Sequence, residues 1–269
     1  MKKQFVLFSL FVFCALFAVA QNNATNQEQL GNDNSSDVTQ TGFQNTILIL
    51  QEGDLNTLNL GQNGTNNSVN FSNSGAENTV LLDQIGNGNQ TVTLLQASQN
   101  SATNFQEGDG NVINQDLLTD QSEVVVSQQG NNNTAIQMQT GIATNRAYIG
   151  VAGDLNTTTQ AQNGENNVAR TSVVGSQNQV FVTQTGTSNS NGVRIEGNGN
   201  LVNVDQDTDN NIAGDDVDPQ LIQLGDNNNI TLDQTGTSNA ASIYQEGNSN
   251  SVINTQTGVG NTHSSRQVG

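Results

Sequence analysis

Polar and apolar residues alternate along this chain in short runs, and a glycine-containing segment separates one run from the next about every eleven residues. In residues 178–184, for example, Val180 and Val182 share one face with Asn178 and Gln184. Alternation with a period of two, together with many β-branched residues, predicts β-strands. No apolar stripe with helical spacing occurs after Ala20, so we predict an all-β chain of short strands.

The repeated unit is Gln-x-Gly-x-x-Asn, followed by an alternating segment that leads to the next Gln eleven residues on. Asn, two small or apolar residues and the next Gln share one face of this segment, because side chains alternate across a strand. In Gly-x-x-Asn we expect a turn in which both Gly and Asn accommodate a positive φ. Twenty-one complete units run from Gln29 onward, and a partial unit begins at Gln267. One extra residue near Asn145 and six extra residues near 214–219 shift the phase.

A fixed short period of this kind is typical of repeat architectures, in which each unit buries its inner face only by stacking on its neighbours. Two units make a strand-turn-strand-turn coil of about 22 residues, a repeat length that is typical of solenoids. We therefore predict a parallel β-solenoid of about 10–11 coils with two facing sheets, roughly 50 Å long at ~4.8 Å per coil. The C-terminus falls inside a unit with no evident capping segment, so we expect open strand edges that add further copies head to tail.

Stacking in register would align Gln on Gln and Asn on Asn, so that each interior amide donates to one coil and accepts from the other. The predicted ladder glutamines are Gln40, Gln51, Gln62, Gln84, Gln106, Gln128, Gln139, Gln162, Gln184, Gln206, Gln234, Gln245 and Gln256. The predicted ladder asparagines are Asn45, Asn56, Asn67, Asn89, Asn111, Asn133, Asn167, Asn189, Asn211, Asn239 and Asn250. The predicted turn glycines are Gly42, Gly53, Gly64, Gly86, Gly108, Gly130, Gly164, Gly186, Gly236, Gly247 and Gly258.

The N-terminal segment 1–20 differs from the rest of the chain. Lys2 and Lys3 precede an apolar run, and Ala18-Val19-Ala20 supplies small residues before a cleavage point. This arrangement predicts a secretory signal peptide over 1–20. Residues 21–28 are polar and aperiodic, and we expect a short leader there, before a solenoid that spans 29–269.

Composition limits the partners of the secreted chain. Cleavage after Ala20 removes Lys2 and Lys3, which leaves four basic residues against 24 acidic ones and a formal charge of −20. Nucleic acids and anionic membranes require a basic face, so neither is an expected partner, and no second hydrophobic segment predicts membrane insertion. The single Cys, Cys14, leaves with the signal peptide, so no disulfide stabilises the mature chain.

The best copy of the unit, from Ser122 to Gln139, has the pattern Ser-x5-Gln-x-Gly-x-x-Asn-x-Ala-x3-Gln. This pattern resembles the curlin repeat at every defined position. Residues 234–245 resemble it from the first Gln onward, and 162–169 do so until Val173 replaces the last Gln. The periodic resemblance covers 29–269, about nine-tenths of the chain.

The resemblance implies a structural subunit of extracellular curli amyloid fibres of Gram-negative biofilms, with no enzymatic activity and no cofactor. Curli subunits cross the outer membrane unfolded through a dedicated secretion pore, and a nucleator subunit seeds their polymerisation at the cell surface. The expected partners are therefore other copies of the chain, a nucleator and that pore, and the expected roles are adhesion and biofilm matrix. This chain has about twice the coils of the best-known subunits, often Asn where alternate units have Ser, and the insertion at 214–219. These departures leave both the major subunit and the nucleator open.

Other chemistry has few candidate residues. The single His, His263, sits at an inward position and is expected to be a solvated terminal residue. Because the mature chain has one His and no Cys, a zinc or Cys-nucleophile site is not expected. The acidic side chains near the insertion supply either the oxygen ligands of a Ca²⁺ site or a solvated acidic loop. They are Asp205, Asp207, Asp209, Asp215, Asp216, Asp218 and Asp226.

Three further aspartates, Asp54, Asp109 and Asp154, follow the glycine of their units. They serve ordinary turn chemistry or act as gatekeepers whose stacked like charges slow premature polymerisation. The repeated hexapeptide Gln-Thr-Gly-Thr-Ser-Asn at 184–189 and 234–239 raises an ice-binding solenoid as an alternative function. A monomeric solenoid adhesin is the other alternative.

Overall fold

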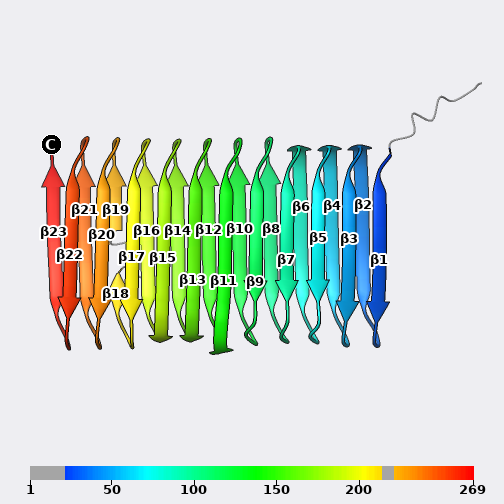
Figure 1. The fold of residues 1–269 in the computed structure, drawn as a ribbon, viewed down its shortest axis with the longest axis horizontal. Helices are drawn as coiled ribbons and strands as arrows, with labels where there is room; N and C mark the ends of the chain where they lie inside the picture. The colour runs from blue at the N-terminus through cyan, green and yellow to red at the C-terminus, as the bar shows by residue number, and fades with distance from the viewer. Residues whose placement is uncertain (1–21, 214–220) are drawn as a thin grey trace, which may run out of the picture.

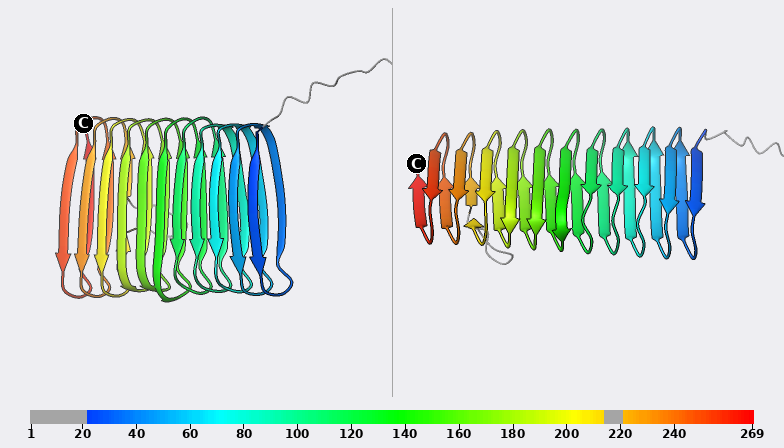
Figure 2. Two further views of the ribbon diagram at one scale, coloured as in Figure 1. Left: turned by 45° about the vertical axis from the view of Figure 1, so that its right-hand side comes forward. Right: turned by 60° about the horizontal axis from the view of Figure 1, so that its bottom comes forward.

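The computed structural model describes residues 22–213 and 221–269, which form a flat stack of strands and turns (Figure 1). The chain winds through two facing layers, and the views in Figure 2 show the coils side by side along one axis. The described residues contain no helix that is long and apolar enough to cross a membrane. Residues 1–20, the predicted signal peptide, lie outside the described part, as does the predicted insertion at 214–219.

Sheet A contains every second strand of the chain up to β17 and then two more. Its strands, in order, are β1 (Ala24–Leu30), β3 (Thr46–Glu52), β5 (Ser68–Asn73), β7 (Gln90–Leu95), β9 (Val112–Leu117), β11 (Thr134–Ala143), β13 (Thr157–Glu165), β15 (Gln179–Thr187), β17 (Leu201–Asp207), β20 (Asn229–Thr235) and β22 (Ser251–Thr257).

Sheet B contains the strands between them. They are β2 (Ser35–Phe43), β4 (Thr57–Thr65), β6 (Thr79–Asn87), β8 (Ser101–Glu107), β10 (Glu123–Gln129), β12 (Arg146–Ala152), β14 (Val168–Val174), β16 (Ser190–Glu196), β18 (Ile212–Ala213), β19 (Leu221–Leu224), β21 (Ala240–Glu246) and β23 (Thr262–Val268).

All strand pairs in the described residues are parallel, and each residue pairs with the equivalent residue of the next coil. Gln62 pairs with Gln84, for example, which lies two eleven-residue units further along the chain. The short strands β18 and β19 both pair with β16, so together they form one rung of sheet B. Each sheet then has 11 rungs, which confirms the prediction of a parallel β-solenoid with about 10–11 coils.

Two irregularities interrupt this spacing. The register of β11 against β13 shifts between Gly141 and Ala143, so the extra residue is Ile142, three residues before the expected position at Asn145. From β16 and β17 to the next rungs, paired residues such as Val193 and Leu221 lie farther apart in sequence than one regular coil. The six additional residues therefore fall between Ala213 and Leu221, around the predicted insertion.

The solenoid begins earlier than the periodic sequence indicates. Strand β1 starts at Ala24 and pairs in register with β3 from Ala24–Thr46 to Leu30–Glu52. Most of the segment 21–28 that we expected to be a separate leader is therefore the first strand. Its polar inward residues, Thr25 and Gln27, hide the alternation, because an alternating pattern is visible only when one face is apolar.

The core consists of inward side chains from both sheets, arranged in two apolar clusters. One lies toward the N-terminal coils and includes Ile47, Leu58 and Phe71, and the other lies toward the C-terminal coils and includes Val180, Val202 and Ile230. The buried polar side chains of the described residues are Asn, Gln, Thr and Ser, with no charged group among them. The interior amides therefore must satisfy one another or the backbone.

Candidate functional site: interior amide ladders and end coils

Sheet B holds a glutamine ladder in its N-terminal half. The Nε2 atom of Gln40 donates to Oε1 of Gln62 at 2.9 Å, and Gln62 donates to Gln84 at 2.8 Å. Gln84 continues to Gln106 at 2.8 Å, and Gln106 to Gln128 at 3.2 Å. Every bond points the same way, from one coil to the coil that follows it in sequence. The ladder therefore gives the stack a chemical polarity.

Sheet A holds the matching ladder in its C-terminal half. It runs with the same polarity through Gln139, Gln162, Gln184, Gln206, Gln234 and Gln256, over distances of 2.8 to 2.9 Å. A short piece in sheet A joins Gln29 to Gln51 at 2.5 Å. Another piece in sheet B joins Gln223 to Gln245 at 3.0 Å and Gln245 to Gln267 at 2.9 Å. Gln29, Gln223 and Gln267 belong to these ladders although they were not among the predicted ladder residues.

Neither ladder is continuous through its sheet. In sheet B, Val151, Val173 and Ile195 occupy the Gln position, and in sheet A it is taken by Asn73, Leu95 and Leu117. The glutamine amide atoms that are buried without a partner in the described residues lie at these interruptions: Nε2 of Gln51, Nε2 of Gln128, Oε1 of Gln139 and Oε1 of Gln223. Eleven of the predicted glutamines thus form two long ladders, one in each half of the solenoid. Gln51 and Gln245 belong to the two short ladder segments.

The asparagines connect coils through the backbone more than through one another. Nδ2 of Asn45 donates to the carbonyl oxygen of Gly64 at 2.9 Å, and its Oδ1 accepts from the backbone N–H of Asn67 at 3.0 Å. Direct bonds between Asn side chains, such as Asn133 to Asn111 at 3.1 Å, occur only at some coils. Each Asn therefore holds the corner of one coil to the next.

Further asparagines occupy equivalent corner positions that the degenerate units obscured. Asn78 donates to the carbonyl oxygen of Ala97 and accepts from the backbone N–H of Asn100. Asn100 in turn accepts from the backbone N–H of Ser122. The others are Asn145, Asn156, Asn178, Asn200, Asn228 and Asn261. The eleven-residue spacing, which survives where the other letters of the unit change, was the signal that could have found them.

All eleven predicted turn glycines have positive φ, between 101° and 135°. At Gly64 a Cβ atom would lie 1.9 Å from the carbonyl oxygen of Gly86 in the next coil, so both the conformation and the space require glycine. The expectation that the Asn also adopts positive φ was wrong. The residue before it does so, as at Leu55 with φ 59°, and the side chain of Asn56 donates to the carbonyl oxygen of Gly75 in the next coil.

The turn aspartates accept backbone hydrogen bonds. Oδ1 of Asp54 accepts from the N–H of Asn32 at 2.7 Å, Asp109 accepts from Asn87 at 2.8 Å, and Asp154 accepts from Asn131 at 2.7 Å. In the coils before and after each of these aspartates, the residue at the equivalent turn position is Asn, Ser or Ala. The prediction of stacked like charges was therefore wrong for these three residues, and the turn interpretation accounts for their contacts.

A further amide ladder lies in the centre of the stack and was not predicted. Nε2 of Gln115 donates to Oε1 of Gln137 at 2.8 Å, and Gln137 donates to Gln160 at 3.3 Å. From the facing sheet, Nδ2 of Asn104 donates to Gln115 at 2.7 Å. These glutamines occupy an inward position that elsewhere holds apolar residues, and their spacing of one coil was visible in the sequence. The ladder makes the middle coils more polar inside than their neighbours.

The described end coils also have polar inner faces. In β23, His263 lies in register with the buried Ala241, and its Nε2 atom is buried without a hydrogen-bond partner in the described part of the chain. It is therefore an inward residue of the end coil and not the solvated terminal residue that we expected. At the other end, Thr25, Gln27 and Ser36 take the inward positions.

The acidic residues near the insertion do not converge in the described coils. Asp205 and Asp207 lie on the outer face of β17, whereas Asp209 and Asp226 accept backbone hydrogen bonds in different turns. Burial raises the pKa of Asp205, and the nearby charges of Asp233 and Asp207 raise it further. Among the described residues no three His, Cys, Asp or Glu side chains are placed to hold a metal ion, and Asp215, Asp216 and Asp218 lie outside them.

One ionic cluster lies on the outer face of sheet B. The hydroxyl of Tyr148 donates to Oε2 of Glu123 at 2.7 Å, and the guanidinium of Arg170 lies 4.3 Å from the Tyr148 ring centre. Burial, followed by the hydrogen bond to Glu123, raises the pKa of Tyr148 to about 12. The cluster joins three consecutive rungs of sheet B.

Comparison with known protein families gives one match. The model of the curlin associated repeat matches residues 31–64 and 225–262, one segment near each end of the solenoid. No curated protein matches the chain. Both matched segments contain the ladder glutamines, corner asparagines and turn glycines described above. Residues 31–64 and 225–262 are therefore similar to curlin associated repeats, and both segments belong to the same parallel β-solenoid.

Proposed function

We propose that this chain is the structural subunit of an extracellular curli-type amyloid fibre, which grows as further copies stack on its end coils. The observation that carries the proposal is the pairing of the end strands. Within the described part of the chain, β1 and β2 pair on one side only, as do β22 and β23. Strands with a free edge are templates for pairing with another chain.

The polarity of the ladders supports head-to-tail addition. Continuing the register by one coil places Gln256 beside Gln29 of the next copy and Gln267 beside its Gln40. Each Gln of the later coil would donate to the Gln of the incoming copy, as Gln234 donates to Gln256 within the chain. The same continuation places Asn and Gly corners opposite one another. A reversed copy would set donors against donors, so one orientation is favoured.

The proposed setting is the surface of a Gram-negative bacterium, where the fibre supports adhesion and the biofilm matrix. Secretion would begin with removal of residues 1–20, which lie outside the described residues, and continue through an outer-membrane pore of the curli type. A nucleator subunit would start each fibre. A role as the nucleator itself is compatible with the same fold, because a nucleator must present the same strand edges.

The alternative functions have less support. An ice-binding face requires a regular row of threonines, but the row that contains Thr185 and Thr235 is interrupted by Asn163 and Asp207. A monomeric adhesin would use the same solenoid without stacking. It differs from the proposal in a single measurable property, which is polymerisation.

The test uses the purified mature chain at neutral pH. We expect fibres that bind thioflavin T after a lag phase, and we expect preformed fibre fragments to remove the lag. A chain that stays monomeric for days, with or without such seeds, would contradict the fibre proposal and favour the monomeric adhesin.

A further inference from the structure

The outer face of sheet A carries an alternation that is independent of the interior ladders. One row of outward side chains, read from rung to rung, is polar and apolar in turn from β1 to β17. Its members are Asn26, Leu48, Asn70, Val92, Asn114, Ile136, Thr159, Phe181 and Asn203. The repeat of this row is two coils, whereas the fold repeats every coil. Folding alone therefore does not require it.

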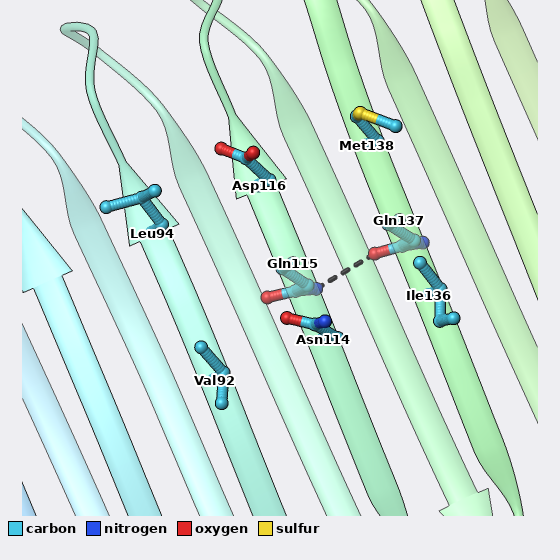
Figure 3. Close-up of a pocket in the computed structure, with 8 residues that line it drawn as sticks. All are labelled: Val92, Leu94, Asn114, Gln115, Asp116, Ile136, Gln137 and Met138. Atoms are coloured by element: carbon cyan, nitrogen blue, oxygen red, sulfur yellow. Dashed lines mark hydrogen bonds between the residues drawn. The ribbon is translucent and has the colours of Figure 1, made fainter.

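A second row of outward side chains, two residues further along each strand, has the same alternation over the rungs β3 to β11. Large apolar pairs form ridges on alternate strands, and small or polar pairs form furrows between them. The ridges are Leu48 with Leu50, Val92 with Leu94, and Ile136 with Met138, and the furrows are Asn70 with Ser72 and Asn114 with Asp116. Figure 3 shows the furrow of β9, with one ridge on either side.

The furrow of β9 is a depression of about 240 Å³ whose walls are the side chains of Val92, Leu94, Ile136 and Met138. The ridges rise into solvent, since Leu48 and Met138 are each 44% exposed and Val92 is 43% exposed. Exposed apolar side chains that are scattered singly need no explanation, but a contiguous and patterned set marks an interaction surface.

Charge narrows the choice of partner. Asp116 is the single charged residue in the two rows between β3 and β11. The four arginines of the described residues all lie on sheet B, in β12, β14, β16 and β23. The ridged strip thus offers almost no charge to a charged partner, and it gives little repulsion between two copies of an otherwise acidic chain.

The spacing of the ridges identifies the partner. Ridges two coils apart are separated by about 9.6 Å, since adjacent strands lie ~4.8 Å apart. A surface fills successive furrows only if it has the same spacing, and a second solenoid of this chain has it. We propose that two copies pair laterally through the strip β3–β11, with the ridges of one in the furrows of the other and a shift of one coil along the axis. Facing sheets pack about 10 Å apart in this way.

The area of the strip decides when pairing occurs. The strip spans four steps between neighbouring strands, which is roughly 20 Å along the solenoid axis, and about five residues of each strand, which is roughly 17 Å across it. Its area is therefore about 350 Å² on each copy. A stable pair usually buries about 800 Å² on each partner. Single copies should therefore remain unpaired, while copies stacked in a fibre pair through many strips at once. The inference thus rests on the proposed fibre.

The experiment compares fibres of the parent chain with two variants by electron microscopy. The ridge variant carries Leu48→Asn and Val92→Asn, and the matched control carries Leu81→Asn and Val125→Asn on the outer face of sheet B, where Leu81 is 46% exposed. We expect paired fibres for the parent and the control, and at least a fivefold smaller paired fraction for the ridge variant. Seeded elongation rates should be equal in all three. Equal pairing of the ridge variant and the parent would overturn the inference, as would single parent fibres or a control that loses pairing.

A third variant separates shape from general hydrophobicity. Asn70→Leu with Asn114→Leu fills two furrows and makes the strip more apolar, yet we expect it to lose pairing. An increase in pairing would contradict ridge-in-furrow packing. Parent fibres that grow normally but stay single would remove this inference alone, whereas a parent that forms no fibres would remove the proposed function along with it.

Discussion

Nε2 of Gln128 and Oε1 of Gln139 are both buried and both lack a hydrogen-bond partner in the described coils, because one ladder ends at Gln128 and the other begins at Gln139. The two residues lie in opposite sheets, on the consecutive strands β10 and β11. In the next rung of sheet B, Val151 pairs with Gln128. In the preceding rung of sheet A, Leu117 pairs with Gln139. Neither side chain can form a hydrogen bond. The amide ladder thus changes sheets in the middle of the solenoid.

This exchange predicts that glutamines at ladder ends contribute less to stability than glutamines inside a ladder. Gln184→Leu would leave the Oε1 atom of Gln206 without its hydrogen-bond donor. Gln128→Leu would instead remove a buried Nε2 group that has no hydrogen-bond partner in the described coils. Leaving a buried polar group unsatisfied costs about 1–3 kcal/mol. We expect Gln184→Leu to lower the free energy of unfolding by about 1–3 kcal/mol more than Gln128→Leu. Denaturant unfolding of the dilute, unpolymerised chain measures both, and equal losses would count against the ladder account.

The turn glycines give a second prediction. Gly64→Ala would place a methyl group 1.9 Å from the Gly86 carbonyl oxygen, while Gly88, with φ 67°, has no atom within 4 Å of the position that a Cβ would occupy. The control Gly88→Ala should therefore cost only the left-handed strain of about 1 kcal/mol. Gly64→Ala should cost at least ~2 kcal/mol more, because the coils must separate locally. Equal unfolding midpoints for the two variants would show that the coil spacing is not tight at the turn.

Such glycines also illustrate what the sequence could and could not predict. The eleven-residue spacing of Gly64 and its equivalents was sufficient to predict the solenoid, its coil length and its inward face, because stacking requires a constant coil length. The exchange of the ladder between sheets was not predicted, since Leu117 and Val151 look like ordinary core residues until their rung neighbours are known. The ladder that begins at Gln115 was not predicted because its glutamines take an inward position that holds apolar residues in other coils, although their one-coil spacing was visible in the sequence. The strand at Ala24 was missed because its inward residues are polar.

Acid pH should stabilise the solenoid slightly through Asp205. Burial and the charges of Asp233 and Asp207 raise its pKa, so the folded state disfavours the charged form. Protonation of Asp205 stabilises the folded state fully below the pKa that this group has in the unfolded chain. The stabilisation is lost as the pH rises through its higher pKa in the folded chain. Asp205→Asn should therefore raise the unfolding free energy at neutral pH, by a few tenths of a kcal/mol for this solvent-facing group, and reduce the gain on acidification.

The control for this pH effect is Asp37→Asn, because Asp37 pairs with Asn59 and has no acidic neighbour in register. This variant controls for the removal of one negative charge from the outer face of the solenoid. An Asp205→Asn variant that is less stable than the parent chain at neutral pH would contradict the expected sign for Asp205.

His263 offers a test of the end coil in fibre growth. It faces inward in register with Ala241, so a stacked copy would cover it. His263→Lys would place an ammonium group at that junction, and we expect it to slow seeded elongation at least tenfold, since burying an unpaired charge or neutralising it is costly. His263→Ala should elongate at about the parent rate, and Ser264→Lys, on the outward side of the same strand, should do so as well. Equal rates for His263→Lys and Ser264→Lys would argue against stacking through this coil.

In the proposed fibre each chain contributes its whole stack of 11 coils to the fibre length. At ~4.8 Å per coil this length is about 53 Å, so a chain of 28.4 kDa with its signal peptide corresponds to about 0.5 kDa per Å of a single fibre. Mass-per-length measurement by scanning transmission electron microscopy of unpaired fibres tests this directly. We predict about 0.5 kDa per Å. A value about tenfold larger, as expected when every chain occupies one layer of about 4.8 Å, would contradict the claim.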